Sequence, residues 1–262
     1  MNRFPIMAFI VGLMLTGCES NDSDRSFSDD YLLLGTYYNQ GVKVEVYAED
    51  SLAVGYNPIY VALYDSTDNR PIEEGHVLLT PVMHMMGLTH SAPVENPDDV
   101  NAVDGLFPCA AVFQMPGNAM EYWELVVDFH EHHEGRSGEI SLQVPVKNSE
   151  RCRVLTGADT AKYIVTWMAP LQTEVGMNDI TFTVHKMESM MSFVPVTDVT
   201  FEMTPSMPSM GHGSPNNMNP SHTQKGHYSG QLNCTMSGDW RIDLVIKRND
   251  VSLLTTYFDI VI

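Results

Sequence analysis

Basic residues are scarce in this chain. Of its 262 residues only 14 are lysine or arginine, against 33 aspartate or glutamate, which gives a formal net charge of −19. Because phosphate binding needs a basic surface, we exclude nucleic acid as a partner. An acidic surface of this kind confers solubility and favours cations at long range.

Signatures of the common enzyme classes are also missing. The sequence contains no Gly-x-Ser-x-Gly elbow, no phosphate-cradling glycine loop and no His-Glu-x-x-His helix. The run His130-Glu131-His132-His133 lacks the helical spacing that brings two ligands of a zinc hydrolase to one face. We therefore expect a non-enzymatic role.

The chain lacks a hydrophobic run long enough to span a bilayer. Its one candidate, residues 6–15, is too short, and it ends in Leu15-Thr16-Gly17-Cys18, which matches the bacterial lipobox. We predict a lipoprotein signal peptide over 1–17, acyl chains on Cys18 that anchor the protein to a membrane, and a flexible acidic tether over 18–35. The expected location is the cell envelope, either the periplasmic face or the outer membrane and cell surface.

An internal repeat dominates the rest of the sequence. Thr-Pro-x-Met begins at Thr80 and again at Thr204, and Gly-x-Asn begins at Gly55 and again at Gly176, at an offset of about 121 positions. A Met-x-Gly followed by a tryptophan strand also occurs in both halves. We predict two domains, 36–150 and 151–262, joined by a polar linker over 147–158.

No amphipathic helix is evident, and short alternating runs typical of β-strands fill both halves. About seven short strands per hundred residues, with turn residues between them, indicate an Ig-like β-sandwich. The predicted fold class is all-β, with two tandem Ig-like sandwiches. We interpret Trp123 and Trp240 as core residues. The expected strands are 42–47, 59–64, 75–79, 107–115 and 140–146, then 163–168, 180–185, 199–203, 228–236 and 251–262.

Three cysteines follow Cys18, so an odd one remains unpaired in an oxidising compartment. We expect Cys109 to pair with Cys152, because both lie in or directly after the first repeat. Cys234 falls in a strand pattern, where a buried thiol is favoured over copper ligation.

Methionine is unusually frequent, with 18 residues, and histidines lie among the methionine clusters. Thioether sulfur is a soft ligand that prefers Cu(I), and imidazole binds Cu(I), Cu(II) and Zn(II), so the mixture points to copper. The alternative is that methionine fills irregular gaps in the core and histidine decorates loops. The candidate ligands are Met83, His84, Met86 and His90 in the first repeat, and Met207, Met210, His212 and His222 in the second.

A separate histidine cluster follows the tryptophan strand of the first repeat. Strand alternation places His130 and His132 on one face, where neighbouring carboxylates could complete a Zn(II) or Cu(II) site. The equivalent turn of the second repeat has no such residues, which favours a solvated hairpin turn instead.

The motif Met207-Pro208-x-Met210-Gly211-His212, with the Trp240 strand that follows, resembles the FixH/YtkA-like domains of bacterial envelope proteins. The resemblance covers most of residues 163–262 and implies a small Ig-like sandwich associated with copper handling or oxidase assembly. It extends to the first repeat only through the duplication. There His84 replaces the motif proline, and Leu88 stands where His212 would be.

Two hypotheses follow. In the first, an envelope lipoprotein binds copper, or another soft metal, through its Met and His loops, for metal handling or delivery to an envelope protein partner. In the second, the chain is a non-metal Ig-like binding or structural module displayed on the cell envelope.

Overall fold

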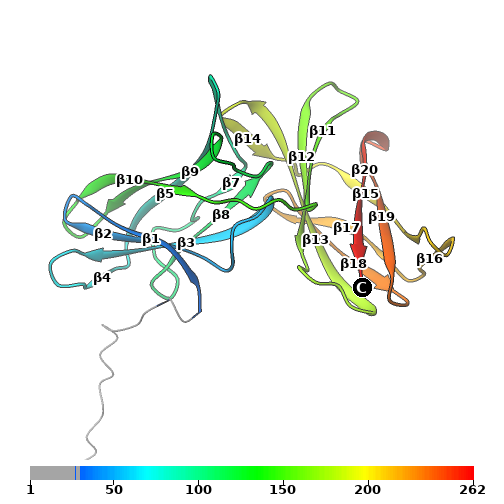
Figure 1. Cartoon of the computed structure of the whole chain (residues 1–262), viewed down its shortest axis with the longest axis horizontal. Coiled ribbons are helices and arrows are strands. Elements are labelled where there is room, and N and C mark those ends of the chain that lie inside the picture. Colours follow the sequence, from blue (N-terminus) through cyan, green and yellow to red (C-terminus); the bar gives the residue numbers. More distant parts are fainter. Residues whose placement is uncertain (1–26, 28–29) are drawn as a thin grey trace, which may run out of the picture.

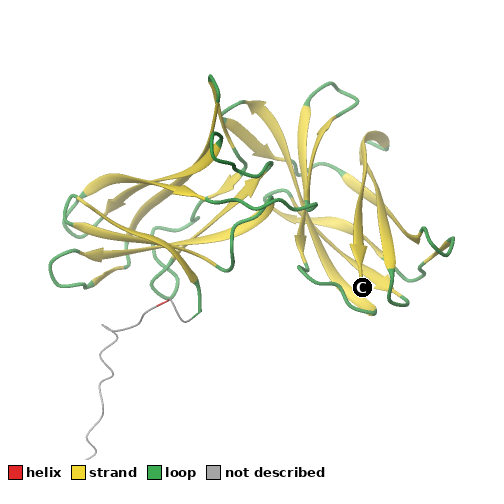
Figure 2. Cartoon of the chain, in the orientation of Figure 1, coloured by secondary structure: helices red, strands yellow, loops and turns green. Residues whose placement is uncertain are grey.

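The computed structural model describes residue 27 and residues 30–262, so the predicted signal peptide, Cys18 and most of the tether lie outside the described residues. Strands joined by loops make up the described part (Figure 2), and none of its helices is long and apolar enough to cross a membrane. The strands form two sandwiches that lie side by side (Figure 1). The predicted all-β fold with two Ig-like units is confirmed.

The first sandwich packs two sheets face to face. One has the strand order β1-β2-β3-β8-β7 with β4 beside β3, and the other has the order β10-β9-β5-β6. The strands are β1 (Leu32–Asn39), β2 (Val42–Ala48), β3 (Gly55–Asp65), β4 (Pro71–Ile72), β5 (Gly75–Met85), β6 (Leu88–Ser91), β7 (Val94–Glu95), β8 (Phe107–Phe113), β9 (Tyr122–Glu131) and β10 (Ser137–Val144).

The second sandwich repeats this topology strand for strand. Its sheets have the orders β11-β12-β13-β18-β17, with β14 beside β13, and β16-β15-β19-β20. The strands are β11 (Cys152–Thr156), β12 (Lys162–Ala169), β13 (Gly176–Ser189), β14 (Ser192–Pro195), β15 (Thr200–Met207), β16 (His212–Gly213), β17 (Met218–Gln224), β18 (His227–Cys234), β19 (Asp239–Arg248) and β20 (Val251–Val261).

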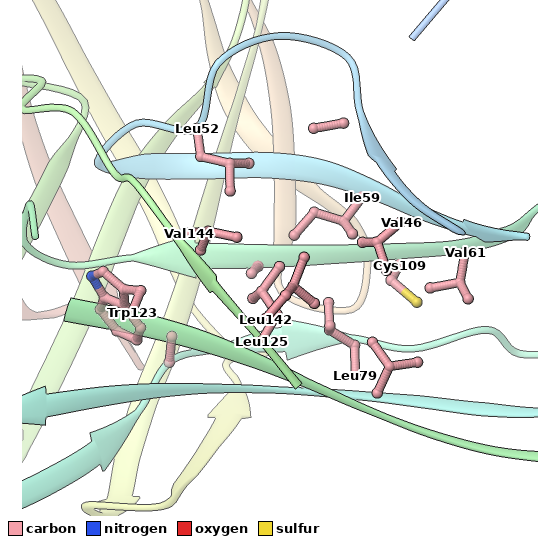
Figure 3. Packing of buried hydrophobic residues seen from close by; sticks show 14 of the residues in the cluster. Val46, Leu52, Ile59, Val61, Leu79, Cys109, Trp123, Leu125, Leu142 and Val144 are labelled. Carbon is pink, nitrogen blue, oxygen red and sulfur yellow. The ribbon is translucent and has the colours of Figure 1, made fainter. Parts of the chain in front are cut away.

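Period-two alternation builds each core. In β9 every second side chain from Trp123 to Phe129 is buried, and the facing sheet alternates in the same way over 42–46 of β2 and 55–61 of β3. Figure 3 shows side chains of both sheets, such as Ile59 and Leu125, meeting between the layers. Trp123 and Trp240 are 0% and 1% exposed, which confirms their interpretation as core residues.

Details of the repeat recur as hydrogen bonds. Asn57 and Asn178 each bond the backbone four residues earlier, at Ala53 and Glu174, and so close the turn that leads into the long β3 and β13. The side-chain oxygens of Asn96 and Asn219 likewise accept the backbone N–H groups of Leu79 and Met203, at 2.7 and 2.9 Å.

Three local expectations need correction. The Thr-Pro-x-Met segments are strand rather than loop, because β5 and β15 run through them to Met85 and Met207. The predicted linker over 147–158 contains β11, and Lys147 is bonded by its backbone to Leu52 and Val54 of the first sandwich, which leaves little free linker. The first strand begins at Leu32, inside the expected tether.

The predicted disulfide is absent. Cys109, Cys152 and Cys234, the cysteines of the described part, are free and buried. Cys109 lies in β8, and Cys152 begins β11 and accepts a hydrogen bond from the Thr166 hydroxyl; both side chains pack in the hydrophobic cluster of the first core. Burial raises the pKa of Cys109 to about 12 and that of Cys152 to about 11, so both remain thiols.

Contacts between the two sandwiches combine a polar and an apolar part. Glu95 bonds Nε2 of His227 at 2.5 Å, and both side chains are at most one-fifth exposed. The backbone N–H of Ser91 donates to the carbonyl of Met190 at 2.8 Å. Ile164 is buried in the same hydrophobic cluster as the core of the first sandwich, and Met187 packs against that cluster.

Candidate functional site

Each sandwich contains the same cluster of a methionine, a histidine and a tryptophan. Met83 pairs with His90 between β5 and β6, and Met207 pairs with His212 between β15 and β16. The His90 ring meets the Trp123 ring edge-on, with centroids 5.4 Å apart, and the His212 and Trp240 rings meet likewise at 6.2 Å. The two methionines are buried, while the histidines are half-buried.

This pairing corrects the residue-by-residue alignment of the repeats. His90, and not Leu88, is the counterpart of His212. The β5–β6 strands continue past the Met83–His90 pair to Met85 and Leu88, so the segment between the paired methionine and histidine is two residues longer than in the second hairpin. The linear comparison therefore placed the histidine two positions too early.

The remaining predicted ligands of the first hairpin diverge. His84 lies next to Glu124, with Nε2 2.9 Å from Oε2, and its ring stacks on Tyr122. Met86 is 82% exposed at the tip of the turn. The hairpin therefore separates a buried Met83 from an exposed Met86, and their role as ligands stays a prediction.

In the second sandwich the predicted ligands divide between its two sheets. Met210 is exposed at the turn of the β15–β16 hairpin, whose backbone N–H groups at residues 210 and 211 donate to the carbonyl of Met207. His222 lies on β17, in the other sheet, and its ring contacts Tyr228.

Near the β9–β10 turn the structure adds a histidine that sequence reasoning missed. His76 pairs with His130 across β5 and β9, and its ring centroid lies 4.8 Å from that of His132. His132 also lies 3.3 Å from Glu74. No group of three or more histidine, cysteine or acidic side chains in residues 27 and 30–262 is arranged to hold a metal ion. Zinc binding at His130 and His132 stays a prediction.

Glu131, the buried residue of this cluster, has a structural role. Its carboxylate accepts the backbone N–H groups of His133, Glu134 and Arg136, and it pairs with the Arg136 guanidinium at 3.0 Å. Although burial raises the pKa of Glu131, these hydrogen bonds lower it to about 2. One sequence signal points to this role of Glu131. The strand alternation that buries every second residue over 123–129 also places residue 131 on the buried face.

A second ionisable cluster lies between the sandwiches. His185 is 2% exposed, and its Nδ1 is buried without a hydrogen-bond partner. Burial lowers the pKa of His185 to about 4, against the opposing attraction of Glu95. The Tyr56 hydroxyl donates to Glu95 at 3.2 Å. Nothing in the local sequence pattern indicates this cluster, because its members come from four separate strands of the two sandwiches.

Comparison with known proteins gives one family and several distant structures. No curated protein matches the sequence. Among solved structures, the Escherichia coli adhesin FdeC is 17% identical with a TM-score of 0.27, and the match covers 87% of this chain and 65% of that one. Domains 5–6 of the S-layer protein SbsC are 15% identical, with a TM-score of 0.29 and coverage of 88% and 98%.

Invasin, a bacterial integrin-binding protein, is 14% identical with a TM-score of 0.27, and the match covers 84% of this chain and 38% of invasin. Residues 158–245 match the model of the YtkA-like family. This segment runs from just after β11 into β19 and includes the paired Met207 and His212. The second sandwich of this chain thus contains a YtkA-like domain over residues 158–245.

Proposed function

We propose that this chain is a non-catalytic binding module of the bacterial cell envelope, built from two Ig-like sandwiches in a fixed relative orientation. The observation that carries the proposal is the contact between the sandwiches, where the Glu95–His227 pair, the Ser91–Met190 backbone bond and the packing of Ile164 act together. Fixing two domains in advance lowers the entropy lost when a partner binds, which suits a binding surface.

Placement on the envelope rests on the lipobox. Acylation of Cys18 would hold the chain at a membrane, with the residues between Cys18 and β1 as the spacer. The acidic surface keeps the displayed domains soluble.

The tip of the first sandwich supplies an apolar contact surface. Met86 and Leu88, at the β5–β6 turn, are 82% and 47% exposed, and Met120, in the loop before β9, is 72% exposed. His84 pairs with Tyr122, so the turn and the loop lie side by side. Exposed apolar side chains gathered at one tip are typical of protein contact sites, and we assign this tip to an envelope protein partner.

Site-specific photo-cross-linking in living cells of the source bacterium tests this function. A cross-linking amino acid at Met86 should give a discrete adduct with one envelope protein, identified by mass spectrometry. The matched control is Tyr38, 67% exposed on β1 of the same sandwich, which should give none. Equal yields at the two positions, or no adduct at Met86, would contradict the assignment.

Soft-metal binding through the two Met–His pairs is a second candidate. The repeated Met83–His90 and Met207–His212 pairs favour it, because in each pair a methionine and a histidine face each other on neighbouring strands. Thioether and imidazole together suit a soft metal. Anaerobic Cu(I) titration against a competing chelator should show binding that weakens in the triple variant Met207→Leu, Met210→Leu and His212→Gln. Unchanged affinity would remove this candidate.

A further inference from the structure

A cavity of about 390 Å³ lies between the two sandwiches. Its walls include His90 and Met115 of the first sandwich and Met187 and Met190 of the second. We propose that it binds a soft monovalent metal ion, of the Cu(I) or Ag(I) class, through the thioethers of the three methionines and the imidazole of His90.

Contacts other than those lining the cavity hold the two methionines of the second sandwich in place. Met187 and Met190 belong to the β13–β14 hairpin, which Figure 1 shows beside the first sandwich. The carbonyl of Met190 accepts the N–H of Ser91, the residue next to His90. Met187 and its strand partner Phe193 pack against the core of the first sandwich. The hairpin is therefore held at the wall that carries the histidine.

The first sandwich fixes its own two donors. Nδ1 of His90 lies 2.8 Å from the carbonyl oxygen of Ser91, and since a carbonyl only accepts, Nδ1 carries the proton. The lone pair is then on Nε2, the nitrogen left for a metal. A backbone carbonyl that orients the other ring nitrogen is the usual support of a metal-binding histidine. The carbonyl of Met115 accepts the Trp123 indole N–H at 2.9 Å, which holds the backbone at that position.

Donor chemistry selects the class of ion. Thioethers are uncharged and soft, and they prefer Cu(I) over divalent ions that favour oxygen. No aspartate or glutamate is among the described residues that line the cavity, so a hard cation has no charged ligand there.

Lys162 is the charged residue of the lining, and it opposes a cation. Its side chain is exposed, so water screens its charge. Replacing it with a neutral residue should strengthen metal binding, which gives the proposal a test that removes no ligand.

The inference goes beyond the proposed display function and is independent of the Met207 hairpin. Its donors come from both sandwiches, so the site exists only in the two-domain chain. The test is an anaerobic titration of the mature chain carrying Cys18→Ser with Ag(I), which has no competing redox chemistry, against a chelator of known affinity.

The double variant Met187→Leu and Met190→Leu keeps the apolar volume and removes two sulfur atoms, and it should weaken Ag(I) binding by about tenfold or more. The control variant Met177→Leu and Met218→Leu, at two exposed positions of the same sandwich, should leave the affinity unchanged. Lys162→Gln should bind Ag(I) more tightly than the parent chain.

Methyl NMR of the methionines identifies the ligands directly, since the signals of Met115, Met187 and Met190 should shift on addition of Ag(I). Unchanged affinity in the Met187→Leu and Met190→Leu variant would overturn the proposal. A loss of binding confined to the Met207, Met210 and His212 triple variant would also overturn it, and would assign the metal to the hairpin instead.

Discussion

Met83 and Met207 occupy equivalent positions in the two cores. Met83 pairs with Trp123 across β5 and β9, and the pairing of Ser206 with Arg241 places Met207 opposite Trp240. The first methionine of each repeated motif therefore packs beside a tryptophan in the core.

Truncating a buried and an exposed methionine of the same hairpin should change stability by different amounts. Met83→Ala removes a fully buried side chain and should lower the free energy of unfolding by about 2–5 kcal/mol. Met86→Ala, at an 82% exposed position of the same hairpin, should change it by less than about 0.5 kcal/mol. Urea denaturation of both variants measures the difference. Equal effects would contradict the buried position of Met83.

His185 should make stability depend on pH. Its pKa is about 4 in the folded protein, below the value of about 6.5 in the unfolded chain, so the unfolded state gains a proton first as the pH falls. Stability should therefore decrease between about pH 6.5 and pH 4, by about 3 kcal/mol at most.

The variant His185→Leu should lack this contribution, whereas His222→Gln, at an exposed position, should retain it. Urea unfolding midpoints at pH 7 and pH 5 give the change in stability with pH for the parent and for each variant. Parallel loss of stability in the parent and in His185→Leu would show that other groups carry the dependence.

At the scale of single elements, the turn between β9 and β10 depends on Glu131. Glu131→Gln removes one of the two buried carboxylates that pair with the Arg136 guanidinium, Asp65 being the other, and should cost about 3 kcal/mol at neutral pH. The folded pKa of Glu131 is depressed to about 2, so its contribution is present above the unfolded value of about 4.3 and is lost as the pH falls toward 2. Thermal unfolding of parent and variant from pH 7 to pH 2.5 should converge at the acid end. A constant gap would contradict this account.

Strand positions were largely predictable from the sequence, because burial on one face imposes alternation that is visible locally. The Thr-Pro-x-Met segments were predicted as loops, because they follow β-patterned runs and have proline and glycine nearby. A proline cannot donate to a β-ladder, yet these segments are strands. In the structure the Leu79 N–H points to Asn96, away from β9. Pro81, two residues on, points the same way, and β6 pairs with β5 only from Val82. The missing N–H therefore breaks no strand pairing.

Candidate sites were less predictable than strands. The His90–Met83 pair depends on a turn length that the repeat does not conserve, and His76 joins the histidine cluster only through strand register. Residues that meet between the sandwiches, such as Glu95 and His227, leave no periodic signal in the sequence.

At the scale of the whole molecule, the relative orientation of the sandwiches should depend on the Glu95–His227 pair. Glu95→Ala leaves a largely buried imidazole without its carboxylate, and it should increase motion between the sandwiches. Small-angle scattering should report a larger radius of gyration for this variant. Lys225→Ala breaks the exposed pair with Asp98 and should leave the radius unchanged. The same radius in both variants would assign the orientation to the remaining contacts between the sandwiches.

The free cysteines have a consequence for how the chain matures. Because Cys109, Cys152 and Cys234 are buried as un-ionised thiols and no cross-link joins the strands, the described fold needs neither an oxidant nor a disulfide isomerase to reach its native state. A change in the redox balance of its surroundings would leave the two sandwiches intact.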